Sequence, residues 1–158
     1  MISVRVYGIL MNSHHQVLVS DEYIRGNYYT KFPGGGLEFE EGTRECLKRE
    51  FREEMNLDIA VGEHLYTTDF FQMSAFNPSD QILSIYYIVH ALESISCTIR
   101  TKIFDFDDQQ MELYQKTGTI ESFRFIDWNN FDASVVTLPI DKVVADLLKL
   151  LPLPTKIT

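Results

Sequence analysis

The sequence predicts a mixed α/β (α+β) fold. Segments rich in β-branched and aromatic residues recur along the chain, as is typical of strands. Two other segments, 43–55 and 140–151, repeat apolar residues with the period of an α-helix. No repeat, low-complexity tract or linker divides the 158 residues. We therefore expect residues 1–158 to form one domain with a mixed β-sheet and helices.

Three short strands are expected at the start of the chain. They cover residues 4–11, 16–20 and 28–32. Polar residues 12–15 predict a turn between the first two strands. The run Pro33-Gly34-Gly35-Gly36 cannot continue a regular strand and predicts a loop.

The segment 43–55 predicts the first helix. It consists of good helix formers, and the hydroxyl of Thr43 is expected to cap its start. Its apolar stripe consists of Leu47, Phe51 and Met55. Asn56 follows, and asparagine is the commonest substitute for glycine in the left-handed residue that ends a helix.

The second half of the chain predicts more strands and a final helix. The strand-like segments are 58–72, 81–92, 97–102 and 122–128. Apolar residues from Ile140 to Leu151 recur at helical spacing, Pro139 lies near the start of this helix, and Pro152 and Pro154 end it. The two remaining stretches, 72–80 and 104–118, are expected to be loops on the side of the functional site.

Composition excludes several classes of protein. There are 14 lysines and arginines against 23 aspartates and glutamates, a net charge of −9, which disfavours a nucleic-acid polymer as partner. The longest apolar stretch, 82–92, is shorter than the ~20 residues of a membrane helix, so no membrane is expected. Cys46 and Cys97 form no metal-binding or disulfide pattern. The first residues predict a strand rather than a leader, and we expect a cytoplasmic protein.

Three glutamates on the first helix stand out as candidate functional residues. Glu50, Glu53 and Glu54 are spaced i, i+3 and i+4, so they share one face, where like charges repel. Glu53 and Glu54 also occupy the last turn, where the helix dipole favours cations. The alternative is a solvated face with ion pairs from Arg49 to Glu45 and Glu53. Carboxylates beside a glycine turn are, however, the hard oxygen ligands that Mg²⁺ prefers, with substrate phosphates completing its coordination.

Residues 35–57 resemble the Nudix box, Gx5Ex7REUxEExGU, of the Nudix hydrolase superfamily, which includes MutT-like proteins. Gly35 and Glu41 match its first two positions, and Arg49-Glu50-Phe51-Arg52-Glu53-Glu54 matches its central run. One defined position differs, because Asn56 replaces the late glycine. Asparagine is the mildest replacement for a left-handed residue, so we expect activity to be kept.

The resemblance implies a fold, an activity and residue roles. The implied fold is an α/β/α sandwich with a mixed β-sheet, the box as loop-helix-loop and a C-terminal helix. The implied reaction is Mg²⁺-dependent hydrolysis of a pyrophosphate bond in a nucleoside diphosphate derivative or a nucleoside triphosphate, with Mn²⁺ as an alternative metal. By position, Glu50, Glu53, Glu54 and the Gly35 carbonyl would bind metal. Glu41 and Arg49 would be structural.

Other residues are weaker candidates. The general base of the family is a box glutamate or one from a later loop, and Glu112 and Glu121 are the loop candidates. Arg25, Tyr28 and Phe76 are candidates for contacts with the phosphate and base of a nucleotide, since bases stack on aromatic side chains. The alternative is an ordinary surface position for Glu112 and Glu121, and a core position for one of the tyrosines Tyr28 and Tyr29.

A second function class stays open. A Nudix-fold nucleotide sensor or interaction module would bind a nucleotide without hydrolysing it. The complete set of box carboxylates favours the enzyme. In either case the expected partner is a small nucleotide, and a homodimer is an assembly that relatives adopt.

Overall fold

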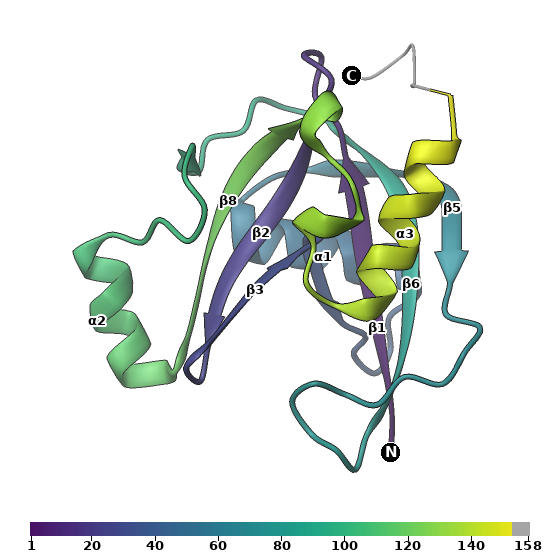
Figure 1. Cartoon of the computed structure of the whole chain (residues 1–158), viewed down its shortest axis with the longest axis horizontal. Coiled ribbons are helices and arrows are strands. Elements are labelled where there is room, and N and C mark those ends of the chain that lie inside the picture. Colours follow the sequence, from purple (N-terminus) through teal and green to yellow (C-terminus); the bar gives the residue numbers. More distant parts are fainter. Residues whose placement is uncertain (153–158) are drawn as a thin grey trace. The chain divides into compact units, whose positions relative to one another are not determined.

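The computed structural model describes residues 1–152, which contain eight strands and three α-helices (Figure 1). The mixed α and β class is therefore confirmed. Contacts divide the chain into two compact units. Unit 1 comprises residues 1–11 and 33–96, and unit 2 comprises residues 12–32 and 97–152. Pro154, expected beyond the last helix, lies outside the described residues. The helices of residues 1–152 all fall short of the length and apolar character needed to cross a membrane.

Unit 1 contains one four-stranded sheet and one helix. Its elements are β1 (Ile2–Leu10), β4 (Gly34–Gly36), α1 (Thr43–Met55), β5 (Ile59–Thr67) and β6 (Gln81–Ala91). The strand order is β4-β1-β6-β5, with β1 and β6 parallel and the other pairs antiparallel. The expected strand over 58–72 is thus shorter, whereas residues 72–80 form the expected loop.

The strand β4 corrects the expectation of a loop at the glycine run. Its register with β1 places Gly35 opposite Val6 and Gly34 opposite Tyr7. Gly34 has a φ of 151°, and a Cβ there would lie 2.0 Å from the Val6 carbonyl oxygen. Only glycine fits this close pairing. The glycine run has low strand propensity, but it forms a strand because it pairs with β1.

Helix α1 packs on the unit 1 sheet through its apolar stripe. Its buried residues are Cys46, Leu47, Phe51 and Met55. A Cβ on Gly8 of β1 would lie 2.9 Å from the Phe51 ring, so glycine lets the helix approach the strand closely. This packing fixes which face of α1 points away from the sheet.

Unit 2 contains the second sheet and two helices. Its elements are β2 (Gln16–Ile24), β3 (Asn27–Lys31), β7 (Ile99–Arg100), α2 (Asp108–Thr117), β8 (Thr119–Asp127) and α3 (Pro139–Leu150). The strand order is β3-β2-β8-β7, and Figure 1 shows β3, β2 and β8 side by side. The predicted C-terminal helix is confirmed as α3, with Pro139 in its first turn.

Helix α2 lies where the sequence predicted a loop over 104–118. It has no buried residues, so it shows no apolar stripe. A capping box starts it: the Asp107 side chain accepts from the Gln110 amide, and the Gln110 side chain accepts from the Asp107 amide. Gln110 Nε2 also donates to the Glu121 carbonyl at 2.9 Å, which ties the helix to β8. The capping box, the bond to β8 and the stacking of Tyr114 on Tyr23 therefore hold this helix, and periodicity does not detect such contacts.

Candidate active site

The predicted helix over 43–55 and the observed α1 have the same bounds. Its start differs from the expectation, because the N-cap residue is Gly42 and the Thr43 hydroxyl instead lies 2.7 Å from the Tyr87 hydroxyl. Its end is as predicted. Asn56 is left-handed, with φ 50° and ψ 42°, and its amide donates to the Arg52 carbonyl at 3.0 Å. Asparagine thus fills the position of the late glycine.

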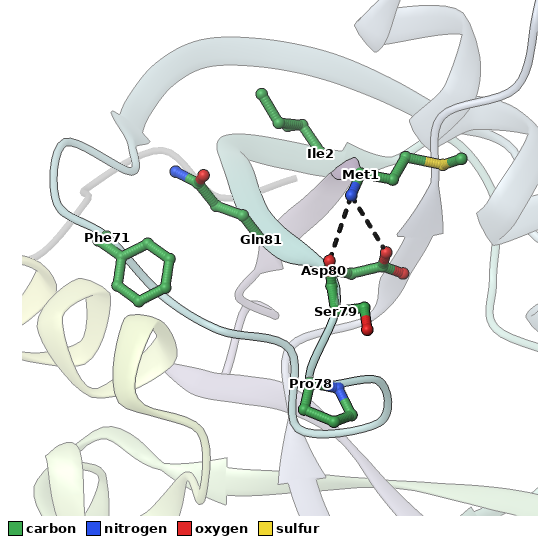
Figure 2. Close-up of a pocket in the computed structure, with 7 residues that line it drawn as sticks. All are labelled: Met1, Ile2, Phe71, Pro78, Ser79, Asp80 and Gln81. Carbon is green, nitrogen blue, oxygen red and sulfur yellow. Dashed lines mark hydrogen bonds and ion pairs between the residues drawn. The ribbon is translucent and has the colours of Figure 1, made fainter.

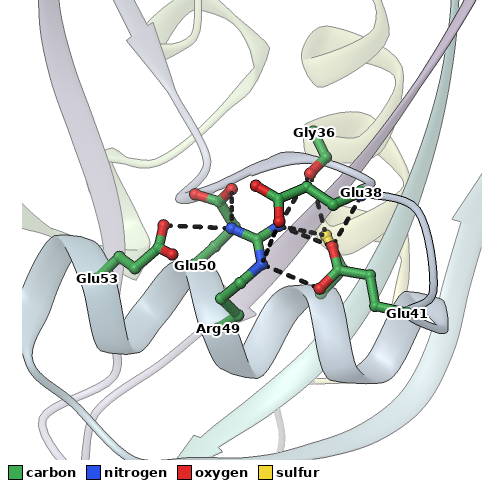
Figure 3. A network of polar contacts seen from close by, with 7 residues as sticks. Gly36, Glu38, Glu41, Arg49, Glu50 and Glu53 are labelled. Atoms are coloured by element: carbon green, nitrogen blue, oxygen red, sulfur yellow. Dashed lines mark hydrogen bonds and ion pairs between the residues drawn. The ribbon is translucent and has the colours of Figure 1, made fainter.

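Arg49 lies at the centre of the polar contacts around α1 (Figure 3). Its Nε and Nη2 donate to the two carboxylate oxygens of Glu41 at 2.9 and 2.7 Å, a bidentate pair. Nη2 also donates to the Gly36 carbonyl at 3.1 Å. Nη1 reaches Glu50 Oε1 at 3.0 Å and Glu53 Oε2 at 3.2 Å. One guanidinium therefore joins the glycine strand, the loop before α1 and two of the candidate carboxylates.

The Arg49 to Glu41 pair is well shielded from water. The side chains are 22% and 12% exposed. The hydrogen bonds from Arg49 lower the pKa of Glu41 to about 2, and the same bonds raise the pKa of Arg49. Both groups are therefore charged at neutral pH, so the ion pair is maintained there.

Cys46 and Glu38 join this network, although the sequence did not single them out. The Cys46 thiol donates to the Gly36 carbonyl at 3.5 Å, and Glu38 Oε2 lies 3.6 Å from Arg49 Nε. Burial raises the pKa of Cys46 to about 12, so it is a packing thiol and not a nucleophile. The available signal was the helical spacing of three between Cys46 and Arg49.

The three candidate carboxylates differ in exposure. Glu50 is 13% exposed, and a Cβ on Gly35 would lie 2.4 to 2.6 Å from its carboxyl atoms. Any side chain larger than that of glycine at position 35 would therefore displace this carboxylate, and we call this close contact the Gly35 cradle. Glu53 is 58% exposed, and Glu54 is half-buried. Oxygen donors of this kind fit Mg²⁺ in chemistry. Within residues 1–152, however, no three acidic, histidine or cysteine side chains are already arranged as a metal site.

The weaker substrate candidates lie in different units. Phe76 belongs to unit 1, in the loop between β5 and β6, and is 40% exposed. In unit 2, Arg25 has a φ of 46° in the turn between β2 and β3. Tyr28 on β3 is 51% exposed and stacks on Tyr23, with ring centroids 4.4 Å apart. In turn, Tyr23 stacks on Tyr114 of α2 at 4.0 Å.

The two candidate loop bases are not in loops. Glu112 is an exposed residue of α2. Glu121 lies on β8, directly opposite Glu22 of β2, and accepts a hydrogen bond from the Ser20 hydroxyl at 3.1 Å. The expectation failed because strand β8 begins at Thr119, three residues before the predicted start, and α2 occupies the expected loop.

A pocket in unit 1 shares no residue with the box (Figure 2). Its lining residues are Met1, Ile2, Phe71, Pro78, Ser79, Asp80 and Gln81. The Met1 ammonium donates to the Ser79 carbonyl at 3.2 Å and lies 3.5 Å from Asp80 Oδ1. These contacts hold the end of the 68–80 loop against the first strand.

Comparisons with known proteins bear on the family and the fold of the chain. The NUDIX domain family model matches residues 1–131. A search of curated proteins finds no significant match. Similar solved structures include a NUDIX hydrolase from Nitrosomonas europaea, with TM-score 0.66, 15% identity, and 95% of this chain and 90% of that chain covered. A second is a MutT structure from work on Aliivibrio salmonicida and Vibrio cholerae. Its TM-score is 0.59 at 17% identity, with 96% of this chain and 100% of that chain covered.

A third similar structure is an ADP-ribose pyrophosphatase from Streptococcus suis. Its TM-score is 0.56 at 14% identity, with 94% of this chain and 87% of that chain covered. At these identities the likeness establishes the fold alone. The fold implied by the box sequence is thereby confirmed.

Proposed function

The chain belongs to the NUDIX domain family, and from this premise we propose that it hydrolyses a pyrophosphate bond in a small nucleotide with the help of a divalent metal ion. The proposed substrates are nucleoside diphosphate derivatives and nucleoside triphosphates. A similar structure is named as an ADP-ribose pyrophosphatase, which supports the first class. The family model runs through both units, which supports our proposal of one domain.

The observation that carries this proposal is the set of contacts around Arg49. Its bidentate pair with Glu41 and its bond to the Gly36 carbonyl hold the start of the box against α1. Its Nη1 orients Glu50 and Glu53. We assign Glu41 and Arg49 the structural role, because their charges satisfy each other.

We assign metal binding to Glu50, Glu53, Glu54 and the Gly35 carbonyl. Mg²⁺ is the proposed ion, with Mn²⁺ as the alternative, because these donors are all oxygens. When bound, such an ion screens phosphate charge and lowers the pKa of a coordinated water. Glu50 is positioned by Arg49 and by its cradle at Gly35, whereas the exposed Glu53 is freer to reorient.

The proton acceptor for the attacking water is proposed to be a box glutamate. Glu53 and Glu54 are the candidates in this set, because Glu50 already lies against Gly35 and contacts Arg49. Glu112 and Glu121 stay as secondary proposals for this role, and Arg25, Tyr28 and Phe76 as proposals for substrate contacts. A cytoplasmic location and a homodimer also remain predictions.

A panel assay tests the proposed function. Nucleoside triphosphates, ADP-ribose, other nucleotide sugars and dinucleoside polyphosphates are incubated with the protein and Mg²⁺, and the products are identified. We expect turnover of at least one, a loss of about 100-fold or more in Glu54→Gln, and near wild-type activity in Glu45→Gln, an exposed glutamate of the same helix.

Two outcomes would overturn the enzyme proposal. One is the absence of turnover of every panel member. The other is a Glu54→Gln variant as active as the wild type. Tight binding of a nucleotide without product over hours would instead support a sensor.

A further inference from the structure

The glycines of β4 differ in what requires them. Gly34 has a positive φ and is pressed against Val6, and Gly35 is pressed against the Glu50 carboxylate. Gly36 has neither constraint. Its φ lies outside the left-handed region, and a Cβ would lie 3.7 Å from Arg5 Nη1, an ordinary contact. Packing therefore explains two of the three glycines and leaves Gly36 unexplained.

Arg5 lies directly beside Gly36 on the neighbouring strand. The register of β1 and β4 pairs these two residues. Gly8 faces α1, as its contact with Phe51 shows, so the odd-numbered Arg5 and Tyr7 point to the opposite face of the sheet. Because Gly36 has no side chain, β4 places no side-chain atom against the guanidinium at this position.

Tyr7 holds the guanidinium in place. Arg5 Nε donates to the Tyr7 hydroxyl at 2.6 Å. Tyr7 itself is 4% exposed, and its ring centroid lies 5.3 Å from that of Tyr86. A Cβ on Gly34 would lie 2.9 Å from the Tyr7 ring. A buried tyrosine thus orients an arginine that is half-buried.

Two opposite charges flank adjacent residues of the glycine strand. The Glu50 carboxylate lies against Gly35 on the α1 face, and the Arg5 guanidinium lies against Gly36 on the other face. β4 is an edge strand without side chains. An anion can approach such a backbone closely, and arginine binds phosphate oxygens with two directed hydrogen-bond donors.

We propose that Arg5 is a substrate-binding residue whose guanidinium binds an anionic oxygen of the diphosphate beside Gly36, with Tyr7 as its positioning residue. This inference rests on the proposed function. It names a contact outside the box that selects phosphate, and it explains why an arginine interrupts the apolar pattern of β1.

Steady-state kinetics on the best panel substrate tests the inference. We expect Arg5→Gln to raise KM about 10- to 100-fold, the usual loss for a charge-assisted hydrogen bond, with kcat changed less than about threefold. Arg5→Lys keeps the charge but loses the pair of directed donors, so its KM should lie between those of the wild type and of Arg5→Gln. Tyr7→Phe should raise KM a few-fold. The matched control is Lys48→Gln, which removes one exposed cation from α1.

A KM of Arg5→Gln within twofold of that of Lys48→Gln overturns the inference. So does a fall in kcat alone, since a contact made equally to substrate and transition state acts on KM. If Arg5→Gln does not fold, Arg5→Lys and Tyr7→Phe decide by the same criterion.

Failure of the proposed function is separable from failure of this inference. If the wild type turns over no panel member, the proposed reaction is wrong. Arg5 is then tested by calorimetric titration with inorganic pyrophosphate in Mg²⁺ buffer. Binding at least about 10-fold weaker in Arg5→Gln than in Lys48→Gln supports the contact, and equal binding rules it out.

Discussion

Arg49 and Glu41 form two parallel hydrogen bonds of 2.9 and 2.7 Å across the loop that leads into α1. The residues are eight positions apart, so helical spacing does not bring them together. Because both side chains are mostly shielded, breaking the pair would leave a charge with poor solvation. The pair therefore links the fold of the loop to the position of the helix.

The first prediction concerns this pair. Glu41→Gln keeps the shape but removes the charge, and we expect the free energy of unfolding to fall by about 1–3 kcal/mol, the cost of losing charge-assisted hydrogen bonds. Urea denaturation measures it. Glu45→Gln, an exposed residue of α1, serves as the control and should change little. Equal stabilities of the two variants would show that the pair holds nothing in place.

The second prediction concerns the end of α1. Asn56 is left-handed and lacks the freedom of glycine, so Asn56→Gly should leave stability unchanged or raise it by a few tenths of a kcal/mol. Asn56→Ala should lower it by about 1 kcal/mol, because alanine is disfavoured at positive φ. Thermal unfolding distinguishes the two. An alanine variant as stable as the glycine variant would mean that the helix ends differently in solution.

The sequence predicted those features of the site that depend on local residue spacing, and it did not predict those that depend on strand pairing. Periodicity and composition alone set the bounds of α1, and the identity of Asn56 predicted its left-handed end. The box pattern predicted Glu50, Glu53 and Glu54 as metal ligands, and the structure brings the first two to Arg49. The sequence did not indicate Arg5, because its proposed role depends on its pairing with Gly36. Neither segment alone predicts that β1 pairs with β4.

Two elements were mispredicted for related reasons. The glycine run has no strand propensity of its own, and β1 supplies the hydrogen-bonding partner that makes β4 a strand. Helix α2 has no buried apolar stripe, so its sequence signals were the capping box of Asp107 and Gln110 and the helix propensity of its residues. In both cases context outside the segment decided the structure.

The third prediction is a dependence of stability on pH through Asp107. The hydrogen bond from the Gln110 amide lowers the pKa of Asp107 below its ordinary value of 3.8, and the hydrogen bond from Arg100 lowers it further. A depressed folded-state pKa contributes stability above the unfolded pKa, and this contribution is lost as pH falls through the folded value. Asp107→Asn still caps the helix but cannot titrate.

The stability difference between wild type and Asp107→Asn should therefore be largest above about pH 4 and shrink below it. Denaturant melts between pH 2.5 and 7 measure this difference. Asp108→Asn, one residue into the helix, is the control for a general loss of charge. A difference that stays constant with pH would show that Asp107 does not titrate with a shifted pKa.

The fourth prediction links the acidic face of α1 to metal dependence. Glu50, Glu53 and Glu54 should repel a polyanionic nucleotide unless a divalent cation reverses the local charge. Calorimetric titration with the product nucleotide of the panel reaction avoids turnover. We expect affinity at least about 10-fold weaker in EDTA than in Mg²⁺, a difference of about 1.4 kcal/mol.

Glu53→Gln makes this prediction sharper, because Glu53 is the more exposed of the two proposed metal ligands that contact Arg49, at 58% against 13% for Glu50. In EDTA the variant should bind the nucleotide more tightly than the wild type, since one repelling charge is gone. In Mg²⁺ it should bind no better or more weakly, since one proposed ligand is gone. Simple repulsion without a metal site would make the variant tighter under both conditions, so the reversal of order is the result that requires a metal bound at this face.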